Sequence, residues 1–301
     1  MKHPRFLAIG VLVAGVLTPV LSDAQLFTLT KEQLIEYTAQ NPFERFADGR
    51  PKVPDAFIAR ARGLSAEEVF AILPGQGFRN QYAGDFRVLH PDKKLVGRAF
   101  TVQFMPLRPD LDAVITAKAK AAGLPRLNNQ VAIDMLQPGD VLVVDLFGQE
   151  EGGTIVGDNL FYYIMKTTKG GGLVVDGAIR DLEGISRMDM PAYFRGVHPS
   201  AIGNVIISGI NIPVRIGKTL VMPGDVVLAD REGMWFIPPQ AVKDVVESGE
   251  LSKARDDWSL MMLGTGKYTS RQIYGPLTPE LQKLRDEYVF QKTGRRPSPE
   301  K

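Results

Sequence analysis

The sequence predicts one mixed α/β domain, with strands in the middle and helices outside. Short β-branched runs bounded by glycine or proline predict buried strands, as at 173–175 and 226–230. Segments with helix-capping residues and apolar side chains at helical spacing predict helices between them. Two Pro-Gly-Asp turns, at 138–140 and 223–225, resemble a duplication. Because Pro-Gly suits any tight turn before a strand, we interpret them as two hairpin entries within one domain.

The first residues of the chain indicate where the protein acts. Lys2, His3 and Arg5 precede an apolar run over 6–21, and small residues follow it. The pattern predicts a secretory signal peptide, residues 1–24, with cleavage after Ala24. A permanent anchor is disfavoured, since the run is shorter than the ~20 residues of a spanning helix. We expect a periplasmic or secreted bacterial protein with no stable membrane anchor after cleavage.

Composition excludes several kinds of site. Hydrophobic residues make up 44% of the 301 residues and charged residues 23%, which is typical of a globular protein with a substantial core. The absence of cysteine excludes disulfides, thiolate metal sites and cysteine nucleophiles. Three histidines disfavour a multi-histidine zinc site. A net charge of +2 is too balanced to indicate nucleic-acid binding.

Helix-capping signals mark the elements before the first strand. Thr30 and Gln33 have the spacing of a capping box and predict a short helix near 31–39, inside an N-terminal extension, 25–64. Ser65 and Glu68 repeat the signature and open the helix with which the main domain, 65–250, begins. A strand, an alanine-rich helix, a second strand and two further β-rich segments follow, at 95–104, 112–122, 141–145, 205–207 and 212–216.

A C-terminal helical extension, 251–301, completes the chain. Thr278 and Pro279 predict a helix start. The helix carries an apolar stripe at helical spacing, formed by Leu281, Leu284, Tyr288 and Val289. Such a stripe needs an apolar partner, either on its own subunit or on a neighbour, and we expect it to strengthen an oligomer.

The candidate site combines two motifs in the middle of the chain. Gly157-Asp158-Asn159-Leu160 precedes a helical run, and the strand at 173–175 leads to Arg180-Asp181. Loops at strand ends are where α/β folds usually carry chemistry. Arginine pairs with a carboxylate or enolate, and aspartate offers the oxygen ligand that Mg²⁺ prefers. The alternatives are a salt-bridged helix start at Arg180-Asp181 and ordinary N-cap chemistry at Asp158 and Asn159.

These motifs resemble the RraA-like family, which includes the class II 4-hydroxy-4-methyl-2-oxoglutarate aldolases. The similarity continues upstream and downstream and covers roughly 65–250, through the segments 96–102, 223–230, Gly233 and 237–238. The resemblance implies a swivelling β/β/α-type domain, assembled as homotrimers or homohexamers, with the site at a subunit boundary. It also implies a late acidic residue that crosses this boundary, for which Glu247 and Glu250 are the candidates.

The resemblance further implies a divalent-metal-dependent lyase that cleaves a small 2-oxo acid through a pyruvate-like enolate. Retro-aldol cleavage and oxaloacetate decarboxylation both pass through that enolate. By analogy, Asp181 holds Mg²⁺, Mn²⁺ or another divalent ion, and Arg180 faces the enolate oxygen. The backbone amides of Gly157, Asp158, Asn159 and Leu160 bind the substrate carboxylate, while Asp158 orients a water molecule for proton transfer.

Other functions for the scaffold remain open. The family also includes the regulator of ribonuclease E activity, whose branch lacks aspartate after the arginine, so Asp181 favours the enzyme branch. An exported, non-catalytic binding or interaction protein on the same scaffold is the alternative. We expect Lys166 and Lys169 at the surface rather than in a Schiff base. We also expect His198 to be a loop hydrogen-bonder and Asp176 to support the turn that aims Arg180.

Overall fold

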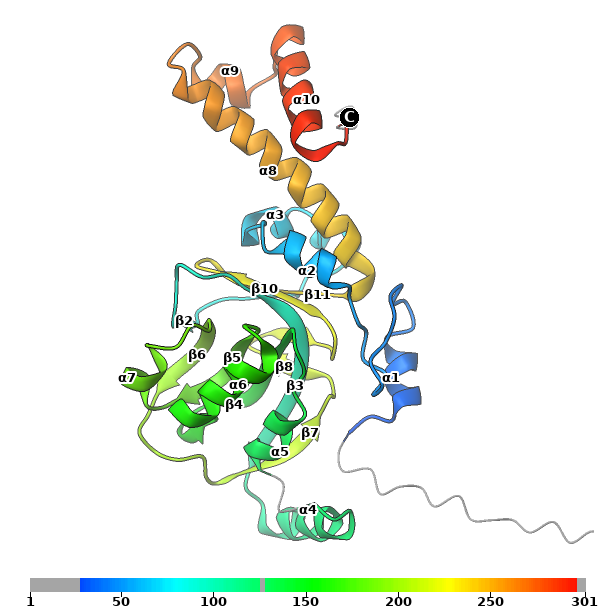
Figure 1. Ribbon diagram of the computed structural model, residues 1–301, viewed down its shortest axis with the longest axis vertical. Helices are drawn as coiled ribbons and strands as arrows, with labels where there is room; N and C mark the ends of the chain where they lie inside the picture. The colour runs from blue at the N-terminus through cyan, green and yellow to red at the C-terminus, as the bar shows by residue number, and fades with distance from the viewer. Residues whose placement is uncertain (1–27, 125–127, 297–301) are drawn as a thin grey trace, which may run out of the picture.

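The computed structural model describes residues 28–124 and 128–296, so the expected signal peptide lies outside the described residues. Within that part of the chain, nine strands form one mixed sheet in the order β1-β11-β10-β3-β4-β5-β6-β2, with β7 paired to β3 off this path. Helices lie around it (Figure 1). The mixed α/β class predicted from the sequence is confirmed.

Four parallel strands form the centre of the sheet. They are β3 (Leu95–Pro106), β4 (Asp140–Thr154), β5 (Gly172–Ile179) and β6 (Ala192–Val197). Parallel strands are covered on both faces and therefore read as continuous apolar runs. All eight residues of β5 are buried, as this rule requires.

Antiparallel strands flank this centre. Next to β3 lie β7 (Val205–Ile210) and β10 (Val226–Asp230), and beyond β10 come β11 (Gly233–Ile237) and β1 (Tyr82–Ala83). The other edge strand is β2 (Arg87–Val88), paired with β6. The strands β8 (Val214–Ile216) and β9 (Thr219–Val221) form a separate hairpin.

The helices fall into two groups. Between the strands come α4 (Pro109–Ala121), α5 (Asn129–Asp134), α6 (Asp158–Thr168) and α7 (Leu182–Ile185). The second group, α2 (Asp55–Ala61), α3 (Ala66–Phe70) and the start of α8 (Val242–Gly264), packs on β10 and β11 in one apolar cluster (Figure 1). The remaining helical segments are α1 (Lys31–Tyr37), η1 (Pro74–Gln76), η2 (Pro239–Ala241), α9 (Ser270–Tyr274) and α10 (Pro279–Thr293).

The two capping boxes are confirmed. The hairpin interpretation of the Pro-Gly-Asp turns holds for 223–225, which leads into the antiparallel pair β10 and β11, and is wrong for 138–140, since both neighbours of β4 in the sheet are parallel to it. Thr30 and Ser65 each exchange hydrogen bonds with the predicted partner, Gln33 and Glu68. The turn at 138–140 follows α5 and leads into a strand parallel to β3, while the turn at 223–225 joins β9 to β10. Neither turn joins paired neighbours, because a tight turn fixes only the local direction of the chain.

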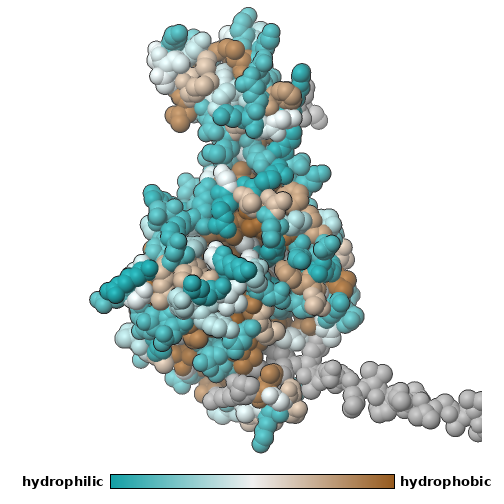
Figure 2. All heavy atoms as spheres, in the orientation of Figure 1, coloured by the Kyte–Doolittle hydropathy of each residue, from teal (hydrophilic) through white to brown (hydrophobic). Residues whose placement is uncertain are grey.

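The C-terminal helices form an arm that projects from the body of the molecule (Figures 1 and 2). Its core lies between α8, α9 and α10 and contains Trp258, Met262, Ile273 and Leu281. Most of the apolar stripe of α10 is therefore covered on its own subunit, through Leu281, Tyr288 and Val289, whereas Leu284 is 53% exposed. The C-terminal extension was predicted to begin at residue 251. The helix α8 continues without a break across that boundary. Over 28–124 and 128–296, no helix has the length and hydropathy of a membrane span.

An ion pair fastens the N-terminal segment to the sheet. The Arg50 guanidinium lies 3.0 Å and 3.3 Å from the two carboxylate oxygens of Asp140, and both side chains are fully buried. The guanidinium also lies over the rings of Phe46 and Phe100, 4.8 Å and 4.9 Å from their centroids. Asp140 is the first residue of β4, so this contact joins the segment before α2 directly to a central strand.

Candidate functional site

The two motifs predicted from sequence meet at the carboxyl end of the parallel strands. Arg180 follows β5 directly, and its backbone N–H donates to the Val156 carbonyl, 3.1 Å away. Gly157, the next residue, is the N-cap of α6. In open α/β sheets, ligands bind at this edge, where loops leave the strands.

The carboxylate of Asp181 is turned away from the helix that it begins. Asp181 is the N-cap of α7 and has a left-handed backbone with φ of 59°, yet its side chain makes no capping hydrogen bond. Instead Oδ2 accepts from the Asp158 N–H at 3.4 Å and lies 3.6 Å from Nε of Arg180. An aspartate that served only to start a helix would bind the helix amides. The carboxylate is 45% exposed, so it is available to a ligand.

Gly157 makes room for this carboxylate. A Cβ at position 157 would lie 2.3 Å from Asp181 Oδ2 and 3.0 Å from Arg180 Nε. The backbone of Gly157 has φ of −103°, which any residue tolerates, so the requirement for glycine is steric. The sequence predicted Gly157 as the entrance of a helix. The structure shows in addition that the missing side chain leaves space for Arg180 and Asp181.

Asp158 is the first residue of α6, so the N-cap interpretation of Asp158 and Asn159 is wrong. The reason is that Gly157 already has extended backbone and occupies the cap position. Asp158 Oδ1 accepts from the Asn159 N–H at 2.7 Å. Its Oδ2 packs over Gly184 of α7, where a Cβ would lie 3.0 Å away. The carboxylates of Asp158 and Asp181 therefore both lie between α6 and α7.

A cavity of about 540 Å³ adjoins these residues. Of the residues predicted from sequence, Gly157, Leu160 and Arg180 line it, whereas Asp158, Asn159 and Asp181 do not. The other walls come from β3 and β7, from the start of α5 with Asn128, Asn129 and Gln130, and from the loop 201–204. Sequence reasoning missed these amide side chains. Asn128 is the N-cap of α5, and the sequence gave no sign that it lines the same cavity as Arg180.

The donor set suits one kind of metal ion. Over the described residues, no group of three or more His, Cys, Asp or Glu side chains could enclose an ion. Mg²⁺ retains several waters and is commonly held by one or two carboxylates together with the substrate. Asp181, with Asp158 beside it, fits that pattern, and it does not fit a structural zinc site.

The structure shows the surroundings of four other candidates. His198 Nδ1 lies 2.9 Å from Ser200 Oγ, which confirms the prediction of a loop hydrogen-bonder. Asp176 is structural but does not support Arg180, because its oxygens bind Nε of Arg195 and the Gly217 N–H. Lys166 and Lys169 are exposed, as expected.

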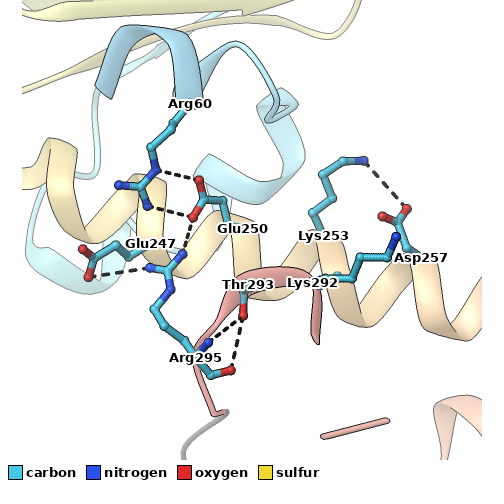
Figure 3. A pocket seen from close by; sticks show the side chains of 9 residues that line it. Arg60, Glu247, Glu250, Lys253, Asp257, Lys292, Thr293 and Arg295 are labelled. Atoms are coloured by element: carbon cyan, nitrogen blue, oxygen red, sulfur yellow. Dashed lines mark hydrogen bonds and ion pairs between the residues drawn. The ribbon is translucent and has the colours of Figure 1, made fainter. Parts of the chain in front are cut away.

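Glu247 and Glu250 are paired within the chain (Figure 3), and neither lines the cavity beside Arg180. Glu250 forms a bidentate ion pair with Arg60 of α2, at 2.8 Å and 2.7 Å, and also binds Arg295. Glu247 lies 3.7 Å from Arg295. These contacts fasten the end of the chain to α8 and α2.

Comparisons with known proteins identify the scaffold. The family model described as RraA-like (Aldolase/RraA) matches residues 51–235. A Halalkalibacterium halodurans protein named "Putative 4-hydroxy-4-methyl-2-oxoglutarate aldolase" is 35% identical over 121 residues, which are 40% of this chain and 56% of that protein. An Arabidopsis thaliana protein named "Putative 4-hydroxy-4-methyl-2-oxoglutarate aldolase 3" is 30% identical over 153 residues, which are 50% of this chain and 83% of that protein.

Solved structures share the fold. Streptomyces coelicolor RraAS2, described as an unusual member of the RNase ES inhibitor RraA protein family, superposes with a TM-score of 0.58 at 27% identity. That match covers 73% of this chain and 100% of the other. An uncharacterized Pseudomonas syringae protein matches with a TM-score of 0.61 at 20% identity, over 74% of this chain and 98% of the other.

Proposed function

Since this chain belongs to the RraA-like family, we propose that it is a divalent-metal-dependent lyase that cleaves a carbon–carbon bond of a small 2-oxo acid. The observation that carries this proposal is the Asp181 carboxylate, which is exposed, unused for capping and set beside Arg180. The relatives named as aldolases support it at about one third identity. The proposed substrates are 4-hydroxy-4-methyl-2-oxoglutarate and oxaloacetate.

The chain's own residues bind and orient the substrate. In the described part of the chain, the Arg180 guanidinium pairs with Asp181 through Nε, 3.6 Å from Oδ2, so its other N–H groups are available to an oxyanion. In the first turn of α6, the Asp158 and Asn159 N–H groups already donate to Asp181 Oδ2 and Asp158 Oδ1, so the contact with the substrate carboxylate would come from the Leu160 N–H, which has no helical acceptor. Arg180 and α6 therefore hold the two oxygens at one end of a 2-oxo acid.

The retro-aldol step breaks the bond between C3 and C4 of the substrate. A base removes the proton of the C4 hydroxyl group, the C4 carbonyl forms, and the electron pair of the broken bond passes into an enolate. Asp158 would relay the proton through water, and C3 is then protonated to give pyruvate. Arg180 stabilises the charge that develops on the enolate oxygen. A divalent ion held by Asp181, with Mg²⁺ or Mn²⁺ as the best fit, supplies Lewis-acid stabilisation of the same charge.

Pyruvate release tests the proposal. The purified protein is assayed on both substrates with Mg²⁺, with EDTA, and as Asp181→Ala. Asp189→Ala is the matched control, because Asp189 is an exposed aspartate that pairs with Lys93 away from the site. We expect turnover that requires the metal, survives in the control and is lost in Asp181→Ala. Turnover retained in Asp181→Ala would refute the assigned metal ligand.

A binding or interaction protein is the second candidate function. The similarity to RraAS2, which is described as a member of an inhibitor family, favours it. It predicts no pyruvate release from either substrate by a folded protein. The Arg180-Asp181 pair, whose carboxylate is exposed and makes no capping hydrogen bond, supports the enzyme.

Location and assembly are part of the same proposal. We propose that a signal peptidase cleaves after Ala24 and that the mature protein acts in the periplasm or outside the cell. Mass spectrometry of the protein from a periplasmic fraction tests the cleavage point. We further propose a homotrimer or homohexamer, which light scattering on the purified protein would distinguish from a monomer.

A further inference from the structure

The two Pro-Gly-Asp turns hold buried aspartates in the same way but differ in their counter-charge. In the first turn, Asp140 accepts a hydrogen bond from the N–H of Gln137, three positions earlier, at 2.9 Å. In the second, Asp225 Oδ2 accepts from the Met222 N–H, also at 2.9 Å. Asp140 is paired with the buried guanidinium of Arg50. Over 28–124 and 128–296, no side chain pairs with the carboxylate of Asp225.

Burial makes this unpaired carboxylate unusual. Asp225 is 1% exposed, and its carboxylate receives a single backbone hydrogen bond. Burial is the main reason that the pKa of Asp225 rises to about 7, while the Met222 N–H opposes the rise. An ionised carboxylate in the interior is costly unless a cation or further donors accompany it. Carboxylates in such surroundings are commonly found at functional sites.

Asp225 lines a cavity of about 580 Å³, which is a usual size for a small-molecule site. The other walls come from the end of α1 and the residues after it, from the segment 78–81, from β9 and from η2. Asp225 and Pro238 are buried, whereas Glu36 and Tyr37 are exposed. The cavity wall therefore reaches from the surface of the molecule to the buried carboxylate.

The lining of the cavity suits an organic cation. Among the described residues that line it, the charged ones are Glu36 and Asp225, and both are acidic. Tyr37 and Phe78 contribute aromatic rings, which attract cations and pack against carbon chains. Metal ions such as Mg²⁺ and Ca²⁺ prefer a shell of oxygen atoms and water. No group of three or more acidic, His or Cys side chains in the described part of the chain could enclose one.

We propose that this cavity binds a small organic ammonium ion, whose nitrogen pairs with Asp225 as Arg50 pairs with Asp140 and whose carbon chain packs on the apolar wall. The cavity shares no lining residue with the one beside Arg180. The inference is therefore independent of the proposed lyase activity. The competing occupant is a cation from a second copy of the chain, which would leave no space for a free ligand.

Calorimetry with n-butylammonium chloride on the purified full-length protein tests the proposal. The matched neutral probe is 1-butanol, which has the same carbon chain with a hydroxyl group in place of the ammonium group. We expect n-butylammonium to bind at least about tenfold more tightly than 1-butanol at pH 8. Equal binding of the two probes, displacement of n-butylammonium by Mg²⁺, or no binding would overturn the inference. No binding is the result expected if a second copy fills the site.

The pH dependence of binding tests whether Asp225 is the partner. The titratable groups among the described residues that line the cavity are Glu36, Tyr37 and Asp225. Asp225 must be ionised to pair with the ammonium group, and its pKa is about 7. The ionised fraction therefore rises about tenfold between pH 6 and pH 8, and the dissociation constant should fall by about the same factor. An affinity that does not change over this range would overturn the inference.

Three variants test the location. Asp225→Asn keeps the shape of the side chain without its charge, and it should weaken n-butylammonium binding by about tenfold or more and remove the pH dependence. Glu36→Gln, at an exposed position, should weaken binding less and keep the pH dependence. Asp189→Asn is the matched control, because Asp189 is exposed and pairs with Lys93, and it should bind as the wild type does. Unchanged binding in Asp225→Asn would overturn the inference. If that variant does not fold, the two probes and the pH dependence in the wild type still decide it.

Discussion

Replacement of Arg50 should expose how strongly the N-terminal segment is joined to the sheet. In Arg50→Met the ion pair with Asp140, at 3.0 Å and 3.3 Å, is lost, while an unbranched side chain still fills the space between Phe46 and Phe100. Asp140 keeps one hydrogen bond, from the Gln137 N–H at 2.9 Å. Removing one partner of a buried pair typically costs about 3–5 kcal/mol.

Protonation of Asp140 sets an upper bound on this cost. Burial raises the pKa of Asp140 above its ordinary value of 3.8, and Arg50 opposes that rise, so its loss should raise the pKa further. At pH 7 the variant can remove the unpaired buried charge by protonating the carboxyl, which costs about 4 kcal/mol. At pH 5 the same protonation costs about 2 kcal/mol. The folded state of the variant binds the extra proton, so its stability should fall as pH rises from about 4 towards 7.

Urea unfolding at both pH values measures these quantities. We expect Arg50→Met to lose about 4 kcal/mol at pH 7 and about half of that at pH 5. In the double variant with Asp140→Asn, which removes both charges of the pair, much of the loss should be recovered. A loss below about 1 kcal/mol at pH 7, typical of an exposed pair, would refute the reasoning, as would a loss that is equal at the two pH values.

Three further predictions concern other parts of the molecule. Asp225 is fully buried, and burial raises its pKa to about 7, so wild-type stability should fall as pH rises from about 4 to about 7. Asp225→Asn should remove this slope and gain up to about 4 kcal/mol at pH 8, measured by urea unfolding; a slope that persists would assign it to other groups. Gly157→Ala places a Cβ against Asp181 Oδ2, so it should weaken Mg²⁺ binding by about tenfold, with little change in melting temperature. Calorimetry measures that affinity, and wild-type binding would contradict the steric argument. Leu281→Ala, in the core of the arm, should cost about 2–4 kcal/mol there and speed hydrogen exchange in α10 but not in β5. Equal acceleration in β5 would show that the arm and sheet unfold together.

Local signals in the sequence were sufficient for much of the fold. The capping boxes at Thr30 and Ser65 depend on residues three positions apart, and the Pro-Gly turns depend on two adjacent residues, so both could be identified without tertiary information. The strand at 173–175 was predicted from its apolar run, but β5 continues to Ile179. The long helix α8 was missed, since its 23 residues carry no strong apolar periodicity.

The residues of the candidate site were likewise predicted only in part. Its charged residues, Arg180 and Asp181, were identified because adjacent residues at the end of a predicted strand form a local pattern. The amide side chains of Gln130 and Asn204 were missed, because these residues are 74 positions apart and line one cavity only in the folded chain. The position of the Asp181 carboxylate depends on a left-handed backbone that its sequence does not require.

Patterns along the chain were enough to predict the fold class and the family, and they marked Arg180 and Asp181 as candidate site residues. The pairing of Arg50 with Asp140, 90 residues away, and the packing of α10 on α8 of its own subunit became visible only in the folded molecule. The same holds for the neutral side chains that line the cavity beside Arg180. The physical reason is that capping, turns and periodicity involve neighbours along the chain, whereas buried ion pairs and cavities join segments that only the folded sheet brings together.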